Sequence, residues 1–220
     1  MANISISRIS QSRISEVDFD HLGFGKVFSD HMFVSDYRDG EWHDHRIVPV
    51  EKISIHPSNM ALHYGQAIFE GLKASKDKAG VPILFRPDKN IERFNRSAIR
   101  MCMPEFPADL MLEALKQLVS LDRDWIPTFP GSSLYLRPFM FATDEFLGVQ
   151  PSTTFKMIIL ASPSGAYYSK PVKLWAEDHF VRAVKGGVGE AKTAGNYAAS
   201  LYPAKLVKER GYDQILWLDG

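Results

Sequence analysis

The amino-acid sequence predicts a mixed α+β fold, with an N-terminal domain of antiparallel sheet and helices and the start of a second domain. Three observations favour this class. Strand-like segments flank a strong hairpin signal at Asp39-Gly40, two amphipathic helical patterns follow, and a stretch rich in Ser, Pro and Gly separates two strand-like regions further along. The 220 residues are 45% hydrophobic, which is enough to bury a substantial core.

The first segments indicate an arm followed by antiparallel strands. Residues 1–24 are rich in Ser and Arg with weak periodicity, which is typical of an extended arm laid on another surface, such as a partner subunit. Residues 25–37 are β-rich, and residues 41–50 and 53–55 are expected to supply the returning strands.

Two amphipathic helices are expected next. The first spans residues 88–102, where Asp88 can cap the N-terminus and Cys102 is expected to be a packed thiol at the far end. The second spans residues 108–119. The expected buried faces carry Ile91, Phe94 and Ala98 in the first helix and Met111, Leu115 and Leu118 in the second, with Arg96 and Arg100 on the solvated face of the first.

Two strands, at residues 133–142 and 154–161, precede the expected domain boundary. We predict that the N-terminal domain covers residues 1–163, that residues 164–171 form an interdomain linker, and that residues 172–220 begin the second domain.

That last region is expected to contain three strands and one helical stretch. The strands are predicted at 172–175, 180–184 and 214–218, and the helical stretch at 196–210, where Pro203 either kinks a helix or starts a new one. Because the hairpin signal Asp219-Gly220 is followed by no second strand, the sequence is expected to be the N-terminal part of a longer polypeptide.

Charge and cysteine usage argue against several classes of partner. The 26 Lys and Arg residues offset 26 Asp and Glu, and they are dispersed, so we expect neither a nucleic-acid nor a membrane partner. No apolar run approaches the roughly 20 residues that cross a bilayer. The single cysteine cannot form an intramolecular disulfide and the N-terminus lacks the apolar stretch of a signal peptide, which favours a cytoplasmic protein.

The run at residues 186–197, Gly-Gly-Val-Gly-Glu-Ala-Lys-Thr-Ala-Gly-Asn-Tyr, is the most unusual in the chain. A solvated loop is the simplest interpretation, a P-loop fails because two residues separate Gly189 from Lys192, and the match to a dinucleotide fingerprint is weak. The remaining interpretation is a Schiff-base lysine, because the small neighbours of Lys192 permit the burial that a carbonyl-binding amine needs. Tyr197 could then hydrogen-bond a cofactor oxygen.

Four ordered motifs carry a resemblance to a known family. They are Leu-His-Tyr-Gly-Gln-Ala-Ile-Phe-Glu-Gly-Leu-Lys at 62–73, Leu-Phe-Arg-Pro at 84–87 with the helix pattern at 90–98, Tyr-Leu-Arg-Pro at 135–138, and Lys-Thr-Ala-Gly-Asn-Tyr at 192–197. Together they resemble the branched-chain amino acid aminotransferases, of the class IV group that uses pyridoxal 5'-phosphate. The resemblance implies the two-domain fold of fold-type IV, whose larger domain is a β-rich pseudo-barrel.

The resemblance also implies roles for the cofactor-binding residues. Lys192 would form the Schiff base with pyridoxal phosphate and, once released by the incoming amino acid, carry the proton between Cα and the cofactor. Arg93 would bind the cofactor phosphate, for which a guanidinium has suitable geometry. Tyr197 would bind the phenolic oxygen of the cofactor.

For the substrate, the resemblance implies an apolar pocket and a homodimer with active sites near the subunit interface. Phe24, Phe69, Tyr135 and Tyr167 match its wall positions, Arg137 shares the strand face of Tyr135, and Tyr64, Leu147 and Val149 match positions that family members supply from the partner subunit. The implied reaction transfers the amino group of leucine, isoleucine or valine to 2-oxoglutarate, so the partners are amino acids and 2-oxo acids.

Several alternatives remain beside this interpretation. A D-amino acid aminotransferase or an aminodeoxychorismate lyase would share Lys192 and Arg93, and a non-catalytic nucleotide-binding module would use the glycines at 186–189. A non-catalytic interaction domain would bind no cofactor. His43 and His45 could present two metal ligands, but no third ligand can be identified, so no metal is expected.

Overall fold

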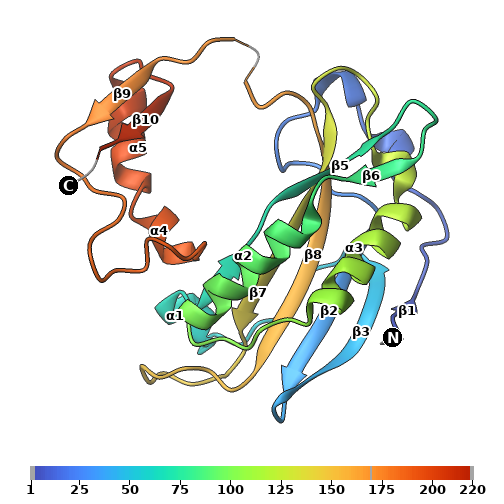
Figure 1. Cartoon of the computed structure of the whole chain (residues 1–220), viewed down its shortest axis with the longest axis horizontal. Coiled ribbons are helices and arrows are strands. Elements are labelled where there is room, and N and C mark those ends of the chain that lie inside the picture. Colours follow the sequence, from blue (N-terminus) through green and yellow to red (C-terminus); the bar gives the residue numbers. More distant parts are fainter. Residues whose placement is uncertain (1–2, 169, 219–220) are drawn as a thin grey trace.

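The computed structural model describes residues 3–168 and 170–218, and its centre is a sheet that joins eight strands within that range. The order is β1-β3-β2-β8-β7-β5-β6, with β4 paired to β7, and the pairs are antiparallel except for β1 with β3 (Figure 1). The strands are β1 (Ser5–Ile6), β2 (His31–Arg38), β3 (Glu41–Pro49), β4 (Ala67–Phe69), β5 (Leu72–Lys76), β6 (Pro82–Leu84), β7 (Ser133–Ala142) and β8 (Phe155–Ser164).

The predicted hairpin is confirmed, and its turn explains the choice of residues. Asp39 and Gly40 have φ values of 55° and 83°, and two positive φ values in succession are what a tight two-residue hairpin turn needs. The strand predicted at 53–55 is wrong. β3 ends at Pro49, and the alternating segment after it pairs with no strand, so its Ile residues stay exposed.

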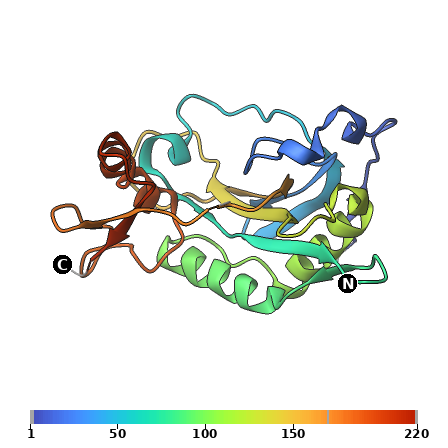
Figure 2. The same ribbon diagram turned by 90° about the horizontal axis from the view of Figure 1, so that it is seen from above.

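Two long helices cover one face of the sheet (Figure 2). They are α2 (Pro87–Arg100) and α3 (Ala108–Leu121), and all six residues predicted on their inner faces are buried. The predicted cap is wrong, because Pro87 starts α2 and Asp88 lies within its first turn. Cys102 is also not packed: it follows the end of α2 at a φ of 53° and is exposed, while Met103 is buried.

The main core lies between this sheet face and the two helices. Its largest fully buried side chains include Phe33, Phe94, Phe106, Leu115 and Trp125. A smaller apolar cluster, which includes Met32, Val34, Phe141 and Ile158, lies on the opposite sheet face. The shorter helical elements are η1 (Ile14–Glu16), η2 (Phe19–His21), α1 (Met60–Tyr64) and η3 (Arg123–Trp125).

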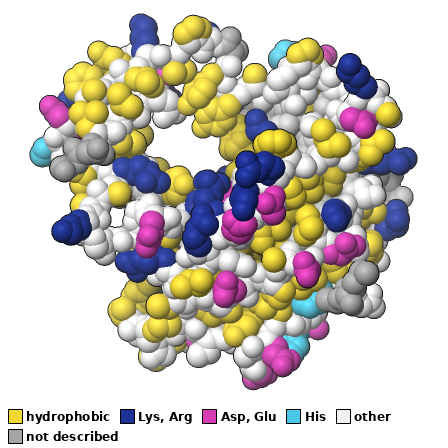
Figure 3. Space-filling view, viewed as in Figure 1, with side chains coloured by type: hydrophobic (Ala, Val, Ile, Leu, Met, Phe, Trp, Pro, Cys, Tyr) yellow, Lys and Arg dark blue, Asp and Glu magenta, His cyan; other side chains and the backbone are white. Residues whose placement is uncertain are grey.

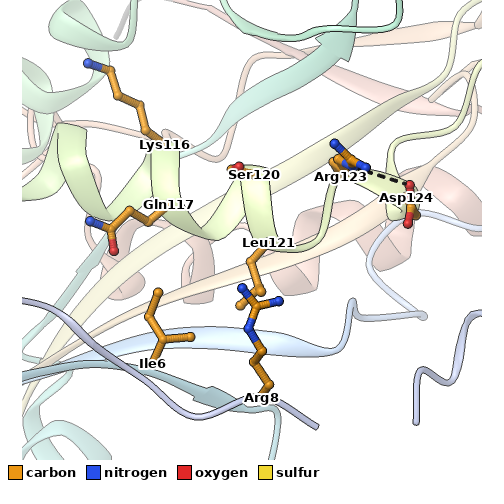
Figure 4. Close-up of a pocket in the computed structure, with 8 residues that line it drawn as sticks. All are labelled: Ile6, Arg8, Lys116, Gln117, Ser120, Leu121, Arg123 and Asp124. Carbon is orange, nitrogen blue, oxygen red and sulfur yellow. Dashed lines mark ion pairs between the residues drawn. The ribbon is translucent and has the colours of Figure 1, made fainter. Parts of the chain in front are cut away.

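Part of the N-terminal arm packs on its own chain, and a contact of the arm with a partner subunit stays a prediction. β1 pairs with β3, and Asp30 holds the arm through its carboxylate, which accepts from Ser12 Oγ at 2.5 Å and from the Arg13 main-chain N–H at 3.1 Å. Trp125 Nε1 donates to the same carboxylate at 2.8 Å. An open cavity of about 570 Å³ remains between the arm and α3, lined by Arg8, Lys116, Arg123 and others (Figure 4).

The C-terminal elements form a separate small group (Figure 1). Within it β9 (Leu174–Glu177) pairs in parallel with β10 (Gln214–Trp217), beside α4 (Ala194–Ala198) and α5 (Leu201–Glu209). The helical stretch predicted at 196–210 is therefore two helices. Pro203 lies in the first turn of the second helix, which confirms the alternative that it starts a new helix. The strand predicted at 180–184 is wrong, because that part of the described chain forms an exposed loop.

The end of the first sheet differs slightly from the prediction. The strand predicted to end at residue 161 continues as β8 to Ser164, which is the first residue of the predicted linker. The linker residue Ser169 and the turn signal Asp219-Gly220 lie outside the described residues. The domain boundaries themselves stay a prediction. In the described ranges, no helix is long and apolar enough to cross a membrane.

The contacts of Asp30 lead to a stability prediction. Burial opposes ionisation, but the hydrogen bonds from Ser12, Arg13 and Trp125 outweigh it and hold the pKa of this carboxyl below its ordinary value. The stabilisation is therefore complete above about pH 4 and is lost as the pH falls through the folded-state pKa. We expect Asp30→Asn to lower the free energy of unfolding by about 1–3 kcal/mol at pH 7, measured by urea denaturation.

The difference between the two proteins should shrink below about pH 4. Asp124→Asn is the matched control, because Asp124 is highly exposed and should change stability by less than about 0.5 kcal/mol. Equal stability of Asp30→Asn and the unsubstituted protein at pH 7 would contradict the role given to Asp30.

Candidate active site

The main chain around Lys192 is bound to β4, which places the lysine side chain at the edge of the sheet. The Phe69 N–H donates to Lys192 O at 3.0 Å, Ile68 and Thr193 form an antiparallel bridge, and Thr193 Oγ1 donates to Ala67 O at 2.8 Å. The ammonium Nζ of Lys192 consequently lies 4.9 Å from the ring centre of Phe69. A glycine-rich surface loop free of the sheet would not have these bonds.

Phe69 is the side chain at which the predicted site residues meet. Tyr197 lies with its ring centre 4.8 Å from that of Phe69, and its hydroxyl is 3.4 Å from Lys192 Nζ. The guanidinium carbon of Arg137 lies 4.6 Å from the Phe69 ring centre. An amine, a phenol and a guanidinium therefore surround one aromatic ring.

The predicted pocket walls also come together. Phe24, Phe69, Tyr135 and Arg137 line a cavity of about 570 Å³, with Phe28, Phe139, Leu160 and Ser162 among its other residues. The Phe24 ring centre lies 4.9 Å from that of Tyr135 and 5.1 Å from that of Tyr167. Tyr167 therefore packs against Phe24 and not on the cavity itself. This cavity is mainly aromatic, with one guanidinium on its wall.

Two local features fix the orientation of Tyr135. Arg137 donates to the Tyr135 hydroxyl from Nε at 3.3 Å and from Nη2 at 3.1 Å. Gly71 supplies the room, because a Cβ atom at that position would lie 2.1 Å from the same hydroxyl oxygen. The two-residue period of β7 puts Tyr135 and Arg137 on the cavity side, as predicted, together with Phe139.

Glu70 is a residue that sequence reasoning missed. Its side chain is fully buried, and its two carboxylate oxygens accept from Nε of Arg93 at 2.7 Å and from Nη2 of Arg93 in a second, short contact. The main-chain N–H of Gly71 donates to the same carboxylate at 2.8 Å. The hydrogen bonds between Arg93 and Glu70 raise the pKa of the Arg93 guanidinium. An acidic residue within the apolar segment at 67–72 was the available signal.

The pair fixes one side of a guanidinium whose side chain is 47% exposed. Figure 3 shows Lys and Arg side chains gathered beside the opening between the sheet and the C-terminal elements. Arg100 does not lie on a solvated face as predicted: its Nη2 donates to Gly187 O at 3.0 Å, and its Nε lies 3.5 Å from Glu190. Arg96 is exposed, as predicted.

Three predicted substrate residues are not brought to the cavity. Tyr64, Leu147 and Val149 are 40%, 65% and 86% exposed. They lie in α1 and in the β7–β8 connection, which meet where the Phe146 N–H donates to Ser58 O at 3.1 Å. The described residues gather no group of three or more His, Cys, Asp or Glu side chains that could hold a metal.

Comparison with known proteins gives a consistent result. The family model described as amino-transferase class IV matches residues 67–220. Branched-chain-amino-acid aminotransferase 2 of Bacillus subtilis is 51% identical over 216 residues, covering 96% of this chain and 60% of that protein. A probable branched-chain-amino-acid aminotransferase of Staphylococcus aureus is 54% identical, covering 92% and 58%. The chain thus spans about 60% of the length of the curated relatives it matches.

Solved structures share the fold. The T.th. branched-chain amino acid aminotransferase, complexed with N-(5'-phosphopyridoxyl)-L-glutamate, superposes with a TM-score of 0.65 at 28% identity, covering 84% of this chain and 58% of that one. The Escherichia coli branched-chain amino acid aminotransferase gives 0.66 at 27% identity, covering 86% and 60%. The described chain therefore has the fold predicted for it, over the N-terminal part of these structures.

The Glu70–Arg93 pair leads to a second stability prediction. We expect Glu70→Gln to lower the free energy of unfolding by about 1–3 kcal/mol, because the buried site loses two charge-assisted hydrogen bonds while the side-chain shape is kept. Thermal or urea unfolding measures this change. Glu92→Gln is the control: it breaks an exposed pair with Lys89 on the same helix, which should contribute less than about 1 kcal/mol. Equal effects of the two substitutions would refute a special role for Glu70.

Proposed function

Because the chain belongs to the class IV aminotransferase family, we propose that the protein transfers the amino group of leucine, isoleucine or valine to 2-oxoglutarate. The observation that carries the proposal is the meeting of Lys192, Tyr197 and Arg137 around the Phe69 ring beside an aromatic cavity. The branched-chain activity in the names of relatives at 51–54% identity supports the choice of substrate.

The residues present fit pyridoxal phosphate by their chemistry. Lys192 offers a primary amine for the aldehyde, and Arg93 offers a guanidinium for the phosphate. Tyr197 offers a hydroxyl group for the phenolic oxygen of the cofactor. Arg93 is already held on one side by Glu70, so it needs little reordering to receive an anion. When bound, pyridoxal phosphate supplies an electron sink for the carbanion at the substrate Cα.

The side chains of this chain then have separate tasks. Nζ of Lys192 would hold the aldehyde of the cofactor and, once displaced by the substrate amine, would take the proton from Cα of the amino-acid substrate in one half of the exchange and deliver a proton to Cα of the 2-oxo acid in the other half. The hydroxyl of Tyr197, 3.4 Å from that nitrogen, restricts where it lies. The rings of Phe69 and Phe24 form part of the apolar wall of the cavity beside that nitrogen.

The cavity wall supports recognition of the substrate. Phe24, Phe69 and Tyr135 offer apolar surface to a branched side chain, and Tyr167 would support this wall by packing against Phe24. Arg137 offers a guanidinium to a carboxylate, and its bonds to the Tyr135 hydroxyl keep it in place. These are the roles that we propose for the substrate-binding residues.

A homodimer is part of the proposal, with active sites near the subunit interface. Tyr64, Leu147 and Val149 are exposed apolar or aromatic side chains outside the cavity, so they would act on the partner subunit's pocket. A cytoplasmic location stays a prediction. A D-amino acid aminotransferase or an aminodeoxychorismate lyase would share Lys192 and Arg93, and a comparison of L-leucine with D-alanine separates these from the proposal.

The first test is spectroscopic, on the purified protein with pyridoxal phosphate. We expect a near-visible absorption band that shifts on addition of L-leucine and not D-alanine, and we expect it to be absent in folded Lys192→Ala. Lys185→Ala is the matched control, because Lys185 lies in the same exposed loop and should keep the band. A folded unsubstituted protein without the band would overturn the proposal, and a response to D-alanine alone would favour the alternative class IV activity.

The second test concerns the phosphate. We expect Arg93→Gln to weaken the binding of pyridoxal phosphate by about tenfold to a hundredfold, since it removes charge-assisted hydrogen bonds worth about 1.5–3 kcal/mol. Arg96→Gln, one helical turn away and exposed, should change the dissociation constant less than about threefold. Titration of cofactor binding by fluorescence measures both. An equal loss in the two variants would reduce the role of Arg93 to general surface charge.

A further inference from the structure

We propose that Ser97 is a positioning residue that ties Lys192 to the helical turn carrying Arg93. The inference rests on the proposed function, because it concerns the separation of the two groups that would hold the cofactor. Ser97 lies on α2, and nothing in the sequence motifs distinguished it from the other inner residues of that helix.

The directions of its two hydrogen bonds are fixed by chemistry. Ser97 is 1% exposed, and its hydroxyl donates to Arg93 O at 3.0 Å, one helical turn back. Its oxygen accepts the main-chain N–H of Lys192 at 2.9 Å. A carbonyl can only accept and an amide N–H can only donate, so the hydroxyl proton goes to Arg93 and an oxygen lone pair remains for Lys192.

The opposite side of Lys192 is bound to the sheet, where its carbonyl oxygen accepts from the Phe69 N–H at 3.0 Å. Lys192 thus bridges two elements, with its N–H bound to α2 and its C=O bound to β4. Most of the loop before it is exposed, so these two bonds fix the main chain from which the reactive side chain extends.

The bonds close a circuit through the site. Phe69 is followed by Glu70, whose carboxylate holds the Arg93 side chain. Arg93 is joined to Ser97 within one turn of α2, Ser97 to Lys192, and Lys192 back to Phe69. Because each step is a short bond or a stiff helical turn, the separation between the Arg93 guanidinium and the Lys192 main chain is set by the fold.

A fixed separation matters because the cofactor is rigid. The phosphate and the aldehyde carbon of pyridoxal phosphate are joined through one aromatic ring and one short arm, so their distance varies little. Two protein groups that bind both ends must therefore be held at a matching distance before the cofactor arrives. Ser97 is the described link from the phosphate side to the lysine through α2.

The direct test is amide hydrogen exchange in the cofactor-free, full-length protein. We expect Ser97→Ala to accelerate exchange at the Lys192 amide about tenfold, because the variant removes its acceptor. Ser35→Ala is the matched control: Ser35 is also fully buried, and its hydroxyl donates to His43 O at 3.1 Å, away from the site. That variant should leave exchange at Lys192 unchanged.

The loaded enzyme gives a second readout. We expect Ser97→Ala to lower kcat about tenfold while KM for L-leucine changes less than about threefold, because the walls of the cavity are untouched. Ser97→Thr keeps the hydroxyl and should recover most of kcat. If Ser97→Ala fails to fold, Ser97→Cys takes its place, because a thiol fills the site but is a weak acceptor, so the same acceleration and loss of kcat are expected.

The outcomes separate this inference from the proposed function. A folded Ser97→Ala protein with unchanged exchange at Lys192 and unchanged kcat would overturn the positioning role while leaving the transaminase proposal standing. An unsubstituted protein that binds no pyridoxal phosphate and transfers no amino group would overturn the proposed function, and the exchange result would still decide whether Ser97 holds Lys192. A fall in stability of equal size for Ser97→Ala and Ser35→Ala, with no local change at Lys192, would mean that Ser97 only supports the core.

Discussion

The ten-residue pairing of β7 with β8 is the constraint on which the sheet and the site depend. It runs from Ser133 opposite Ser164 to Ala142 opposite Phe155 without interruption. A strand alternates its faces with a period of two, so a slip of one residue would send Tyr135 and Arg137 into the core and bring Leu134 and Leu136 to the cavity. Because β2, β4 and β5 pair onto these two strands, the same register fixes where Phe69 meets Lys192.

A second constraint is electrostatic. A fully buried carboxylate such as Glu70 is costly unless its oxygens are hydrogen-bonded and its charge is paired, and here Arg93, the Gly71 N–H and Asn90 provide this. The cost of ordering the Arg93 side chain is thereby met during folding instead of during ligand binding. Glu70 thus acts on the site indirectly, by holding the guanidinium of Arg93, which stays half exposed and accessible to an anion.

How much the sequence could predict depended on the range of the interactions. Local signals were sufficient for the Asp39-Gly40 hairpin, the bounds of β7 and the inner face of α3, because each is set by neighbouring residues. They failed at 53–55 and 180–184, where a β-like pattern pairs with no strand, and at Cys102, where a left-handed backbone turns the thiol outward. The anchoring of the arm by Asp30 could not be predicted for a related reason, since Asp30 shows nothing unusual in the sequence. In the candidate site, motif resemblance led to the residues that we propose touch a ligand, whereas Glu70 and Ser97 make contacts 23 and 95 residues away that no local pattern encodes.

The composition of the cavity also bears on what the proposed exchange can select. An aromatic wall distinguishes side chains that differ by one methylene by only about 1–3 kcal/mol, so as substrate walls Phe24, Phe69 and Tyr135 would favour a class of branched side chains over any one of them. An exchange with 2-oxoglutarate places a different demand on the same space, because that partner carries a second carboxylate. Arg137, on the cavity wall, would bind this second carboxylate. Its guanidinium packs over the Phe69 ring and is held by the Tyr135 hydroxyl. It would therefore offer a charge to an acidic substrate and a flat surface against an aromatic ring to an apolar one. Under the proposed function, one cavity would then serve both halves of the reaction.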